Sequence, residues 1–278
     1  MVGARLTRAV PPGVRSSAAA FGGAMWWAVD AGRRHNAHVN YAAVLGLPED
    51  HPEVRRVARL AFENYGRMLA DFLLMGSLRP DEVHAMVTFD GLEHADAALE
   101  GGRGAVLALP HMGSWDFAGS LAGSCGYPVA AVADTFPGSL NDVVVRTRSM
   151  HGVEIIPLGR STLRRIESML DRNGLVALLC DLPHGAGVDV RFFGRRAVVP
   201  SGPAAIARRR GVPIVPVYSW RKGNHSYHIH VDPPLHPDGG RRRDPSAVAG
   251  LMQQVVERFE MFIRQHPDQW YPFRRILL

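Results

Sequence analysis

The spacing of apolar residues predicts that about the first 85 residues are helical. One helix is expected over 14–33 and a second over 34–45, where a glycine follows. Asp50 is suited to cap a third helix, in which apolar side chains recur every three or four positions until Gly76 closes it. The chain therefore opens with a helical segment rather than with a sheet.

From Met86 onward, short apolar runs alternate with helical stretches, which is typical of crossover units and a mainly parallel sheet. Strands are predicted over 105–109, 129–132, 153–158, 175–179, 212–218 and 227–231, the last as an edge strand. Helices are predicted over 92–100, 115–125, 140–150, 162–172, 203–210 and 245–265. We predict an α/β fold, in which a mainly parallel central sheet is flanked by helices, with a helical N-terminal extension over 1–85 and the core over 86–278.

Composition places the chain among ordinary globular proteins, because 46% of its residues are hydrophobic and 21% are charged. Its two cysteines are too few for a disulfide framework, which favours reduced thiols and the cytoplasmic side of the membrane. The net charge of +6 is carried almost wholly by arginine, since Lys222 is the one lysine. Either a GC-rich genome explains this, or the arginines bind phosphorylated partners or anionic lipid.

No apolar run reaches the ~20 residues that a membrane span needs. The longest candidate, 18–29, stops at Asp30 and follows several arginines. A signal peptide is disfavoured, because no small-x-small cleavage site follows the run. Two interpretations stay open. The segment lies in the membrane interface, with Trp26 and Trp27 at headgroup depth, or it is an ordinary packed first helix.

The strand expected over 105–109 leads directly into a candidate catalytic segment. His111 comes just past its carboxyl end, where open α/β sheets place their active sites. Ser114 can cap the next helix, and Asp116 falls in the first turn of that helix. Its carboxylate can then fold back to the imidazole and fix the ring tautomer. The substrate would supply the nucleophile, although a purely structural His–Asp pair is the commoner arrangement.

The segment His-Met-Gly-Ser-Trp-Asp over 111–116 resembles the HxxxxD/E motif of bacterial glycerolipid acyltransferases. Within that family it is most similar to the late acyltransferases of lipid A biosynthesis and to their actinobacterial relative, the phosphatidylinositol mannoside acyltransferase. Further similar segments follow in the right order over 91–111, 148–157, 199–216 and 267–271. Ser114 and Met112 stand where the family often has Asn and Phe, and Asp116 where it often has Glu.

The resemblance implies an acyltransferase in which His111 is the general base for an acceptor hydroxyl or amine. The activated acceptor would attack the thioester of an acyl-CoA or acyl carrier protein, and His111 would then protonate the thiolate. Asp116 would orient His111 or stabilise its imidazolium, and Arg148 would bind a phosphate or the developing charge. No metal or other cofactor is expected. The implied acceptor is a glycolipid, reached from the cytoplasmic face of the cell membrane by a peripherally bound enzyme.

A second candidate segment is the loop expected over 180–194. In the family this region carries acidic residues near the active site, so Asp181 or Asp189 would reach His111 or the acceptor. We prefer Asp189 slightly, and turn formation is the alternative. Ser114 is a further candidate for acceptor binding, and His184 is more often solvated. The arginine triplets over 208–210 and 241–243 are either solvated charge or contacts for donor phosphates.

Other chemistry finds little support in the sequence. Cys125 and Cys180 are expected to be inert. His225, His228 and His230 have spacing suited to a metal, but strand alternation divides them between two faces, so a surface role is favoured. Two alternatives to a lipid acyltransferase remain. The same chemistry could act on a soluble acceptor, such as a secondary metabolite or a carrier-bound intermediate. A non-catalytic protein could bind lipid or nucleic acid through its arginines, although the motif argues against nucleic acid.

Overall fold

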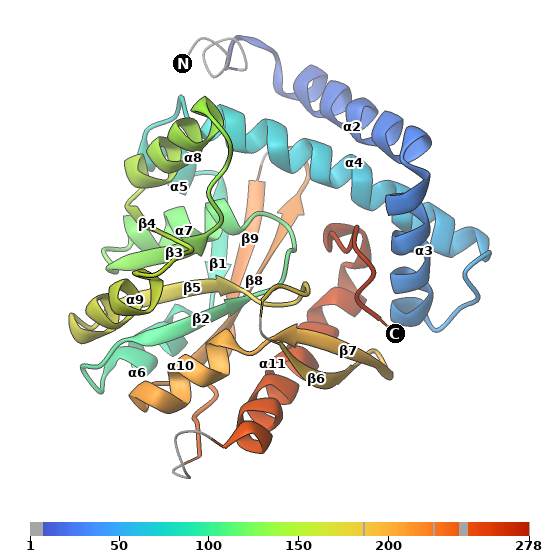
Figure 1. Ribbon diagram of the computed structural model, residues 1–278. Helices are drawn as coiled ribbons and strands as arrows, with labels where there is room; N and C mark the ends of the chain where they lie inside the picture. The colour runs from blue at the N-terminus through green and yellow to red at the C-terminus, as the bar shows by residue number, and fades with distance from the viewer. Residues whose placement is uncertain (1–7, 186, 225, 239–243, 278) are drawn as a thin grey trace.

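The computed structural model describes residues 8–185, 187–224, 226–238 and 244–277. Within these ranges a seven-stranded sheet has the order β1-β9-β8-β2-β5-β3-β4, and β6 and β7 form a separate hairpin (Figure 1). The strands are β1 (Val87–Asp90), β2 (Ala105–Leu109), β3 (Val129–Ala133), β4 (Val153–Pro157), β5 (Leu175–Leu179), β6 (Gly187–Phe192), β7 (Arg195–Pro200), β8 (Ile214–Lys222) and β9 (Ser226–Val231). The predicted α/β class with a mainly parallel sheet is confirmed.

Strands β8, β2, β5, β3 and β4 run parallel to one another, while β9 runs antiparallel to β8 and parallel to β1. In the central pair, Leu109 of β2 lies opposite Leu179 of β5. The two strands therefore end level with each other. The loop that follows β2 therefore lies beside the loop that follows β5, and the candidate site forms between these two loops.

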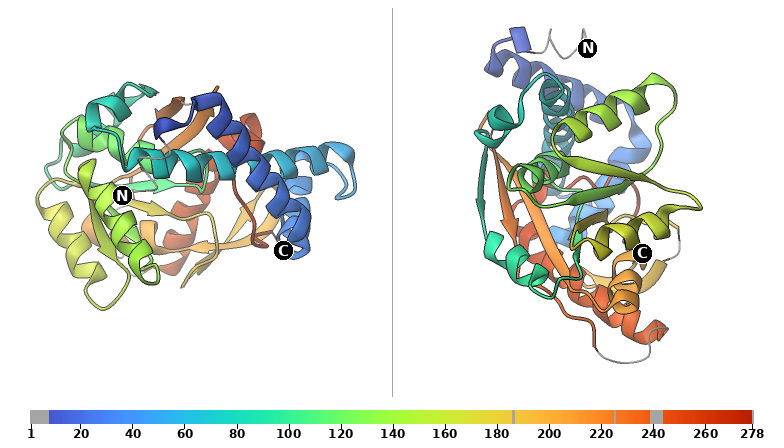
Figure 2. Two further views of the ribbon diagram at one scale, coloured as in Figure 1. Left: turned by 90° about the horizontal axis from the view of Figure 1, so that it is seen from above. Right: turned by 90° about the vertical axis from the view of Figure 1, so that its left-hand side faces the viewer.

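Helices cover both faces of the sheet (Figures 1 and 2). Every residue of β2 is buried, as is expected for the middle of a parallel sheet. Val106 and Ala108 face a core cluster shared with α9, α10 and α11, whereas Leu107 and Leu109 face a second cluster with α6 and α7. The helices are α2 (Pro12–Val29), α3 (Ala31–Leu45), α4 (Pro52–Met75), α5 (Pro80–His84), α6 (Leu92–Leu99), α7 (Trp115–Ser124), α8 (Ser139–Met150), α9 (Thr162–Asp171), α10 (Gly202–Arg210) and α11 (Pro245–Gln265).

The N-terminal helices α2 and α4 lie side by side (Figures 1 and 2). Glycines allow their close approach: a Cβ on Gly23 would lie 2.1 Å from the carbonyl oxygen of Phe62, and one on Gly66 would lie 2.4 Å from that of Ala19. Side chains of α3 and α4 belong to the same core cluster as α11. The N-terminal helices therefore pack into the α/β core, and the domain boundary near residue 85 stays a prediction.

Several sequence predictions need correction. The first helix ends at Val29, because Asp30 interrupts it and caps α3 through the backbone N–H of Arg33. The imidazole of His51, not Asp50, caps α4 by accepting from Glu53. The strand containing 227–231 is not an edge strand, since β1 pairs with its outer side. Strands β1, β6 and β7 and the short helix α5 were not predicted.

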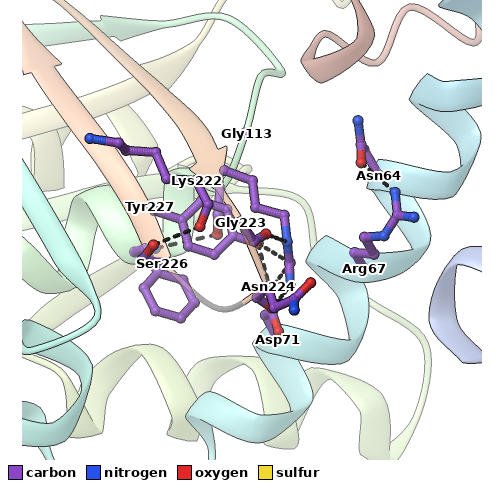
Figure 3. Close-up of polar contacts among 12 residues, drawn as sticks. Asn64, Arg67, Asp71, Gly113, Lys222, Gly223, Asn224, Ser226 and Tyr227 are labelled. Atoms are coloured by element: carbon purple, nitrogen blue, oxygen red, sulfur yellow. Dashed lines mark hydrogen bonds and ion pairs between the residues drawn. The ribbon is translucent and has the colours of Figure 1, made fainter. Parts of the chain in front are cut away.

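A buried ion pair fastens α4 to the sheet. Asp71 of α4 points to the turn after β8 and binds Arg221, and it also accepts from the Tyr227 hydroxyl at 2.8 Å (Figure 3). The guanidinium donates further to the carbonyl oxygens of Gly223 and Asn224. Burial raises the pKa of the Asp71 carboxyl, and the nearby Arg221 opposes this effect. The pair is thus buried on both sides and depends on its full set of partners.

We expect Asp71→Ala to lower the free energy of unfolding by about 3–5 kcal/mol, because it leaves the Arg221 charge buried without its counter-ion. Chemical denaturation followed by circular dichroism measures this. Asp189→Ala is the matched control, since Asp189 forms an exposed pair with Arg196 and its removal should change little. Asp71→Leu combined with Arg221→Met should recover most of the loss. Equal losses for Asp71→Ala and Asp189→Ala would contradict this account.

Candidate active site

The loop between β2 and α7 is held in one conformation from several sides. Gly113 adopts a φ of +59°, and a Cβ there would lie 2.0 Å from the Ser219 carbonyl oxygen, so glycine is required. The Ser219 hydroxyl of β8 donates to the carbonyl oxygen of Met112 at 2.9 Å and accepts from the backbone N–H of Ser114. His111 therefore stands on a rigid support at the carboxyl end of the central strand.

Asp181 is the carboxylate that binds His111. Its Oδ1 lies 2.6 Å from Nδ1 of the ring, and its Oδ2 accepts from the backbone N–H of His111 at 3.0 Å. Asp181 is fully buried, while 26% of the His111 side chain is exposed. Each residue comes two positions after its strand, and β2 and β5 are paired neighbours. With Nδ1 engaged, Nε2 is the ring nitrogen left for chemistry.

Asp116 makes a different contact from the one expected. Its Oδ1 accepts from Nε of Arg148 at 2.6 Å, and both side chains are largely buried. The hydrogen bond to the imidazole that we predicted for Asp116 is made by Asp181 instead. Asp116, Arg148 and His111 nevertheless line one cavity. The structure thus brings together four of the predicted site residues, as a His111–Asp181 hydrogen bond and an Arg148–Asp116 ion pair rather than as one triad.

The remaining predicted residues lie elsewhere. Ser114 is fully buried and caps α7 through the Phe117 backbone N–H, so its hydroxyl does not reach the cavity. Asp189 lies on the exposed face of β6, pairs with Arg196 at 2.6 Å and does not line the cavity. Our preference for Asp189 over Asp181 as the partner of His111 is therefore wrong. His184 does line the cavity.

The cavity beside His111 has a volume of about 890 Å³. One part of its wall is apolar and comes from β2, β3, β5 and α7, including Leu107, Ala131, Ala177 and Gly119. Another part is aromatic and comes from the N-terminal helices and the segment after α11, namely Trp26, Tyr65, Tyr271 and Phe273. Three arginines also line it, Arg33, Arg148 and Arg274. The site can thus hold an aliphatic chain and a polar, anionic group beside one imidazole.

The whole chain, residues 1–278, matches the family described as bacterial lipid A biosynthesis acyltransferase. It belongs to this family. A phosphatidylinositol mannoside acyltransferase of Mycobacterium tuberculosis is 33% identical to it over 241 residues, which cover 84% of this chain and 73% of the relative. One from Mycolicibacterium smegmatis is 30% identical over 276 residues, covering 97% and 87%. The protein is therefore a lipid acyltransferase, and the family resemblance inferred from the sequence is confirmed.

The arginine triplet over 208–210 of this acyltransferase lies in ion pairs. Arg208, whose side chain is 2% exposed, contacts Asp238, while Arg209 pairs with Glu167 and Arg210 contacts Asp171. These contacts favour a structural role over donor binding. The triplet over 241–243 lies outside the described residues.

The structure gives no support to a metal site on β9 or to a cysteine nucleophile in this acyltransferase. His228 and His230 share one face of β9, as predicted, and His225 is not described. Burial raises the pKa of the Cys180 thiol and that of Cys125, which makes both weak nucleophiles. Among the helices that the structure describes, none has the length and apolar character needed to cross a bilayer.

Sequence reasoning missed Trp270 in this acyltransferase. Its indole N–H donates to Oδ2 of Asp181 at 2.7 Å, and the residue is fully buried. In the sequence, the segment 267–271 shows only a resemblance to the family. Nothing in the local pattern tells which carboxylate an indole 89 positions away will meet.

Proposed function

We propose that this acyltransferase moves a fatty acyl chain from an acyl thioester, on CoA or acyl carrier protein, to a hydroxyl group of a glycolipid. The observation that carries the proposal is the buried Asp181 carboxylate, which engages Nδ1 of His111 beside a cavity with an apolar wall. Such a pair supports general-base catalysis by Nε2. Both relatives described above are phosphatidylinositol mannoside acyltransferases, so a phosphatidylinositol mannoside is the first acceptor to test.

In the proposed reaction, Nε2 of His111 takes the proton of the acceptor hydroxyl as its oxygen attacks the thioester carbonyl carbon. A tetrahedral oxyanion forms and then collapses, which breaks the carbon–sulfur bond. The departing thiolate takes the same proton from the imidazolium, so the protons balance and no acyl-enzyme forms. Asp181 stabilises the imidazolium while it exists. Arg148, held by Asp116, supplies a fixed positive charge in the cavity wall for the oxyanion or for a phosphate.

The walls of the cavity suggest how the two substrates divide it. Small side chains, Ala118 and Gly119 of α7 and Ala131 of β3, leave room along the apolar wall for the acyl chain. The aromatic wall, with Arg33 and Arg274, suits sugar rings and a phosphate, because aromatic faces stack on sugars and guanidinium binds phosphate. His111 lines the same space, so the thioester carbonyl and the hydroxyl can meet there.

The outer face of α2 supports binding to a membrane surface. Val14, Phe21, Met25 and Val29 follow one side of the helix, and Phe21 and Val29 are 68% and 73% exposed. The helix contains no acidic residue, and Arg15 is its one basic residue. Trp26 of the same helix lines the cavity. A lipid acceptor could thus pass from the bilayer to the site along α2, at the cytoplasmic face that we expect.

The function is tested by incubating the purified protein with a panel of acyl-CoA and acyl carrier protein thioesters and with a phosphatidylinositol mannoside. Mass spectrometry should find the acceptor heavier by one acyl chain, together with free thiol in equal amount. Donor hydrolysis without an acylated lipid would contradict the assigned acceptor class. Acylation of a soluble hydroxyl compound from a host extract, and of no lipid, would establish the alternative acceptor instead.

Membrane binding gives a separate prediction. Replacing Phe21, Met25 and Val29 by Gln should weaken binding to anionic vesicles by at least about 100-fold. An apolar side chain contributes roughly 1.5–3 kcal/mol when fully buried, and insertion of the three side chains to only about two thirds of their depth already exceeds the ~2.7 kcal/mol that this change requires. Co-sedimentation with phosphatidylinositol-containing vesicles measures this. The matched control replaces three exposed apolar residues elsewhere, Phe89, Leu163 and Met261, by Gln. Equal binding by both triple variants would remove α2 from the membrane-binding surface.

A further inference from the structure

The chain that follows α11 runs along the loop that carries His111. The backbone N–H of Tyr271 donates to the His111 carbonyl oxygen at 2.9 Å, and the N–H of Gly113 donates to that of Gln269 at 2.8 Å. Met112 and Trp270 lie opposite each other between these bonds, as an antiparallel bridge. The residues from 269 to 271 therefore act as a short extra strand on the His111 loop.

Trp270 is the member of this strand that reaches the hydrogen-bonded pair of His111 and Asp181. Its ring packs between Tyr41 of α3 and two phenylalanines of the hairpin, Phe192 at the end of β6 and Phe193 in the turn that follows. Its carbonyl oxygen accepts a hydrogen bond from the Tyr41 hydroxyl. Contacts thus hold both the backbone and the ring of Trp270, and the indole N–H donates to Oδ2 of Asp181.

We infer that Trp270 is a positioning residue for the Asp181–His111 pair, an inference that rests on the proposed function. The carboxylate of Asp181 has three donors: Nδ1–H of His111 on Oδ1, and the His111 backbone N–H and the Trp270 indole on Oδ2. Without the indole, Oδ2 keeps one donor and the carboxylate can turn about its Cβ–Cγ bond. Oδ1 then no longer fixes the proton of His111 on Nδ1.

The tautomer of the His111 ring determines whether Nε2 can act as a base. A His111 ring with its proton on Nε2 cannot accept a proton from the acceptor hydroxyl through that atom. A mixture of tautomers therefore lowers the fraction of competent enzyme. Trp270 does not line the cavity, so substrate binding should be unaffected. This separates positioning from a contribution to the binding site.

The experiment compares Trp270→Phe with Trp27→Phe. Both remove an indole N–H and keep an aromatic ring, but the Trp27 N–H has no hydrogen-bond partner among the described residues. We expect Trp270→Phe to lower kcat about 10- to 100-fold, with an unchanged KM for the acyl thioester. Trp27→Phe should leave both constants unchanged. In 15N spectra of histidine-labelled, substrate-free protein, His111 should move from the Nδ1–H form toward a mixture with the Nε2–H form.

The spectra need no substrate, so they test the inference even if the acceptor class is wrong. An unchanged His111 tautomer in Trp270→Phe, or a fall in kcat shared by Trp27→Phe, would overturn the positioning role. If Trp270→Phe fails to fold, benzothienylalanine at position 270 keeps the ring shape and replaces N–H by sulfur. A folded protein with this side chain and a wild-type kcat would equally reject the role.

Discussion

His111→Gln should lower the rate of acyl transfer by about 10²- to 10⁴-fold, which is the contribution typical of a general base. Glutamine can still donate to Oδ1 of Asp181, and the backbone N–H of His111 that binds Oδ2 is retained. The fold should therefore survive while the proton acceptor is lost. Steady-state rates and the Tm together measure this.

The control for His111→Gln is His35→Gln on α3, an exposed histidine that does not line the cavity. It should keep the wild-type rate. A His111→Gln protein that retained more than about a tenth of that rate would show that another group takes the acceptor proton, and the proposed mechanism would have to be abandoned.

Asp181→Asn should have an effect of the same order, up to about 10⁴-fold in kcat, because an amide cannot stabilise an imidazolium and permits the wrong ring tautomer. The side chain keeps its shape, so KM for the donor should change little. Asp116→Asn provides the contrast. The Asp116 carboxylate binds Arg148 and not the His111 ring. Asp116→Asn should therefore lower kcat as much as Arg148→Gln does, and the double variant should have a kcat no lower than that of either single variant.

These variants test which carboxylate acts on His111, Asp181 as in the structure or Asp116 as in the motif. If Asp116→Asn altered the tautomer of His111 and Asp181→Asn did not, the motif-based assignment would be restored. Kinetics of the four variants with 15N spectra of each decide between the two arrangements.

The central strands could be predicted closely because their apolar runs are continuous. The predicted bounds of 105–109 and 175–179 agree with β2 and β5. By contrast, β1 has one buried residue in four and carries no such run. The β6–β7 hairpin was missed for another reason. Its turn places Phe193 and Gly194 at positive φ, +49° and +75°. Turns with positive φ at both central residues favour Asn, Asp or Gly, so the phenylalanine does not predict this turn.

The site was predictable as far as single strands allow. His111 was predicted to follow the strand 105–109, and Asp181 to lie in the loop that follows the strand 175–179, but sequence order does not give the order of strands in a sheet. Because β5 lies next to β2, with β3 beyond it, the residue that meets His111 lies 70 positions away. Asp116, five positions from His111 in the sequence, seemed the nearer partner. The order of strands in the sheet, not proximity in the sequence, determines which carboxylate binds His111.

The strand formed by residues 269–271 also bears on how activity develops during folding. Trp270 is bound by Tyr41, 229 positions earlier in the sequence, and by Asp181 in the middle of the chain. Contacts of such long range close late, after the local helices and hairpins have formed. A folding intermediate with an intact sheet but an undocked C-terminal segment would hold His111 and yet turn over slowly. Enzymatic activity would then appear with the last step of folding and be the first property lost on heating.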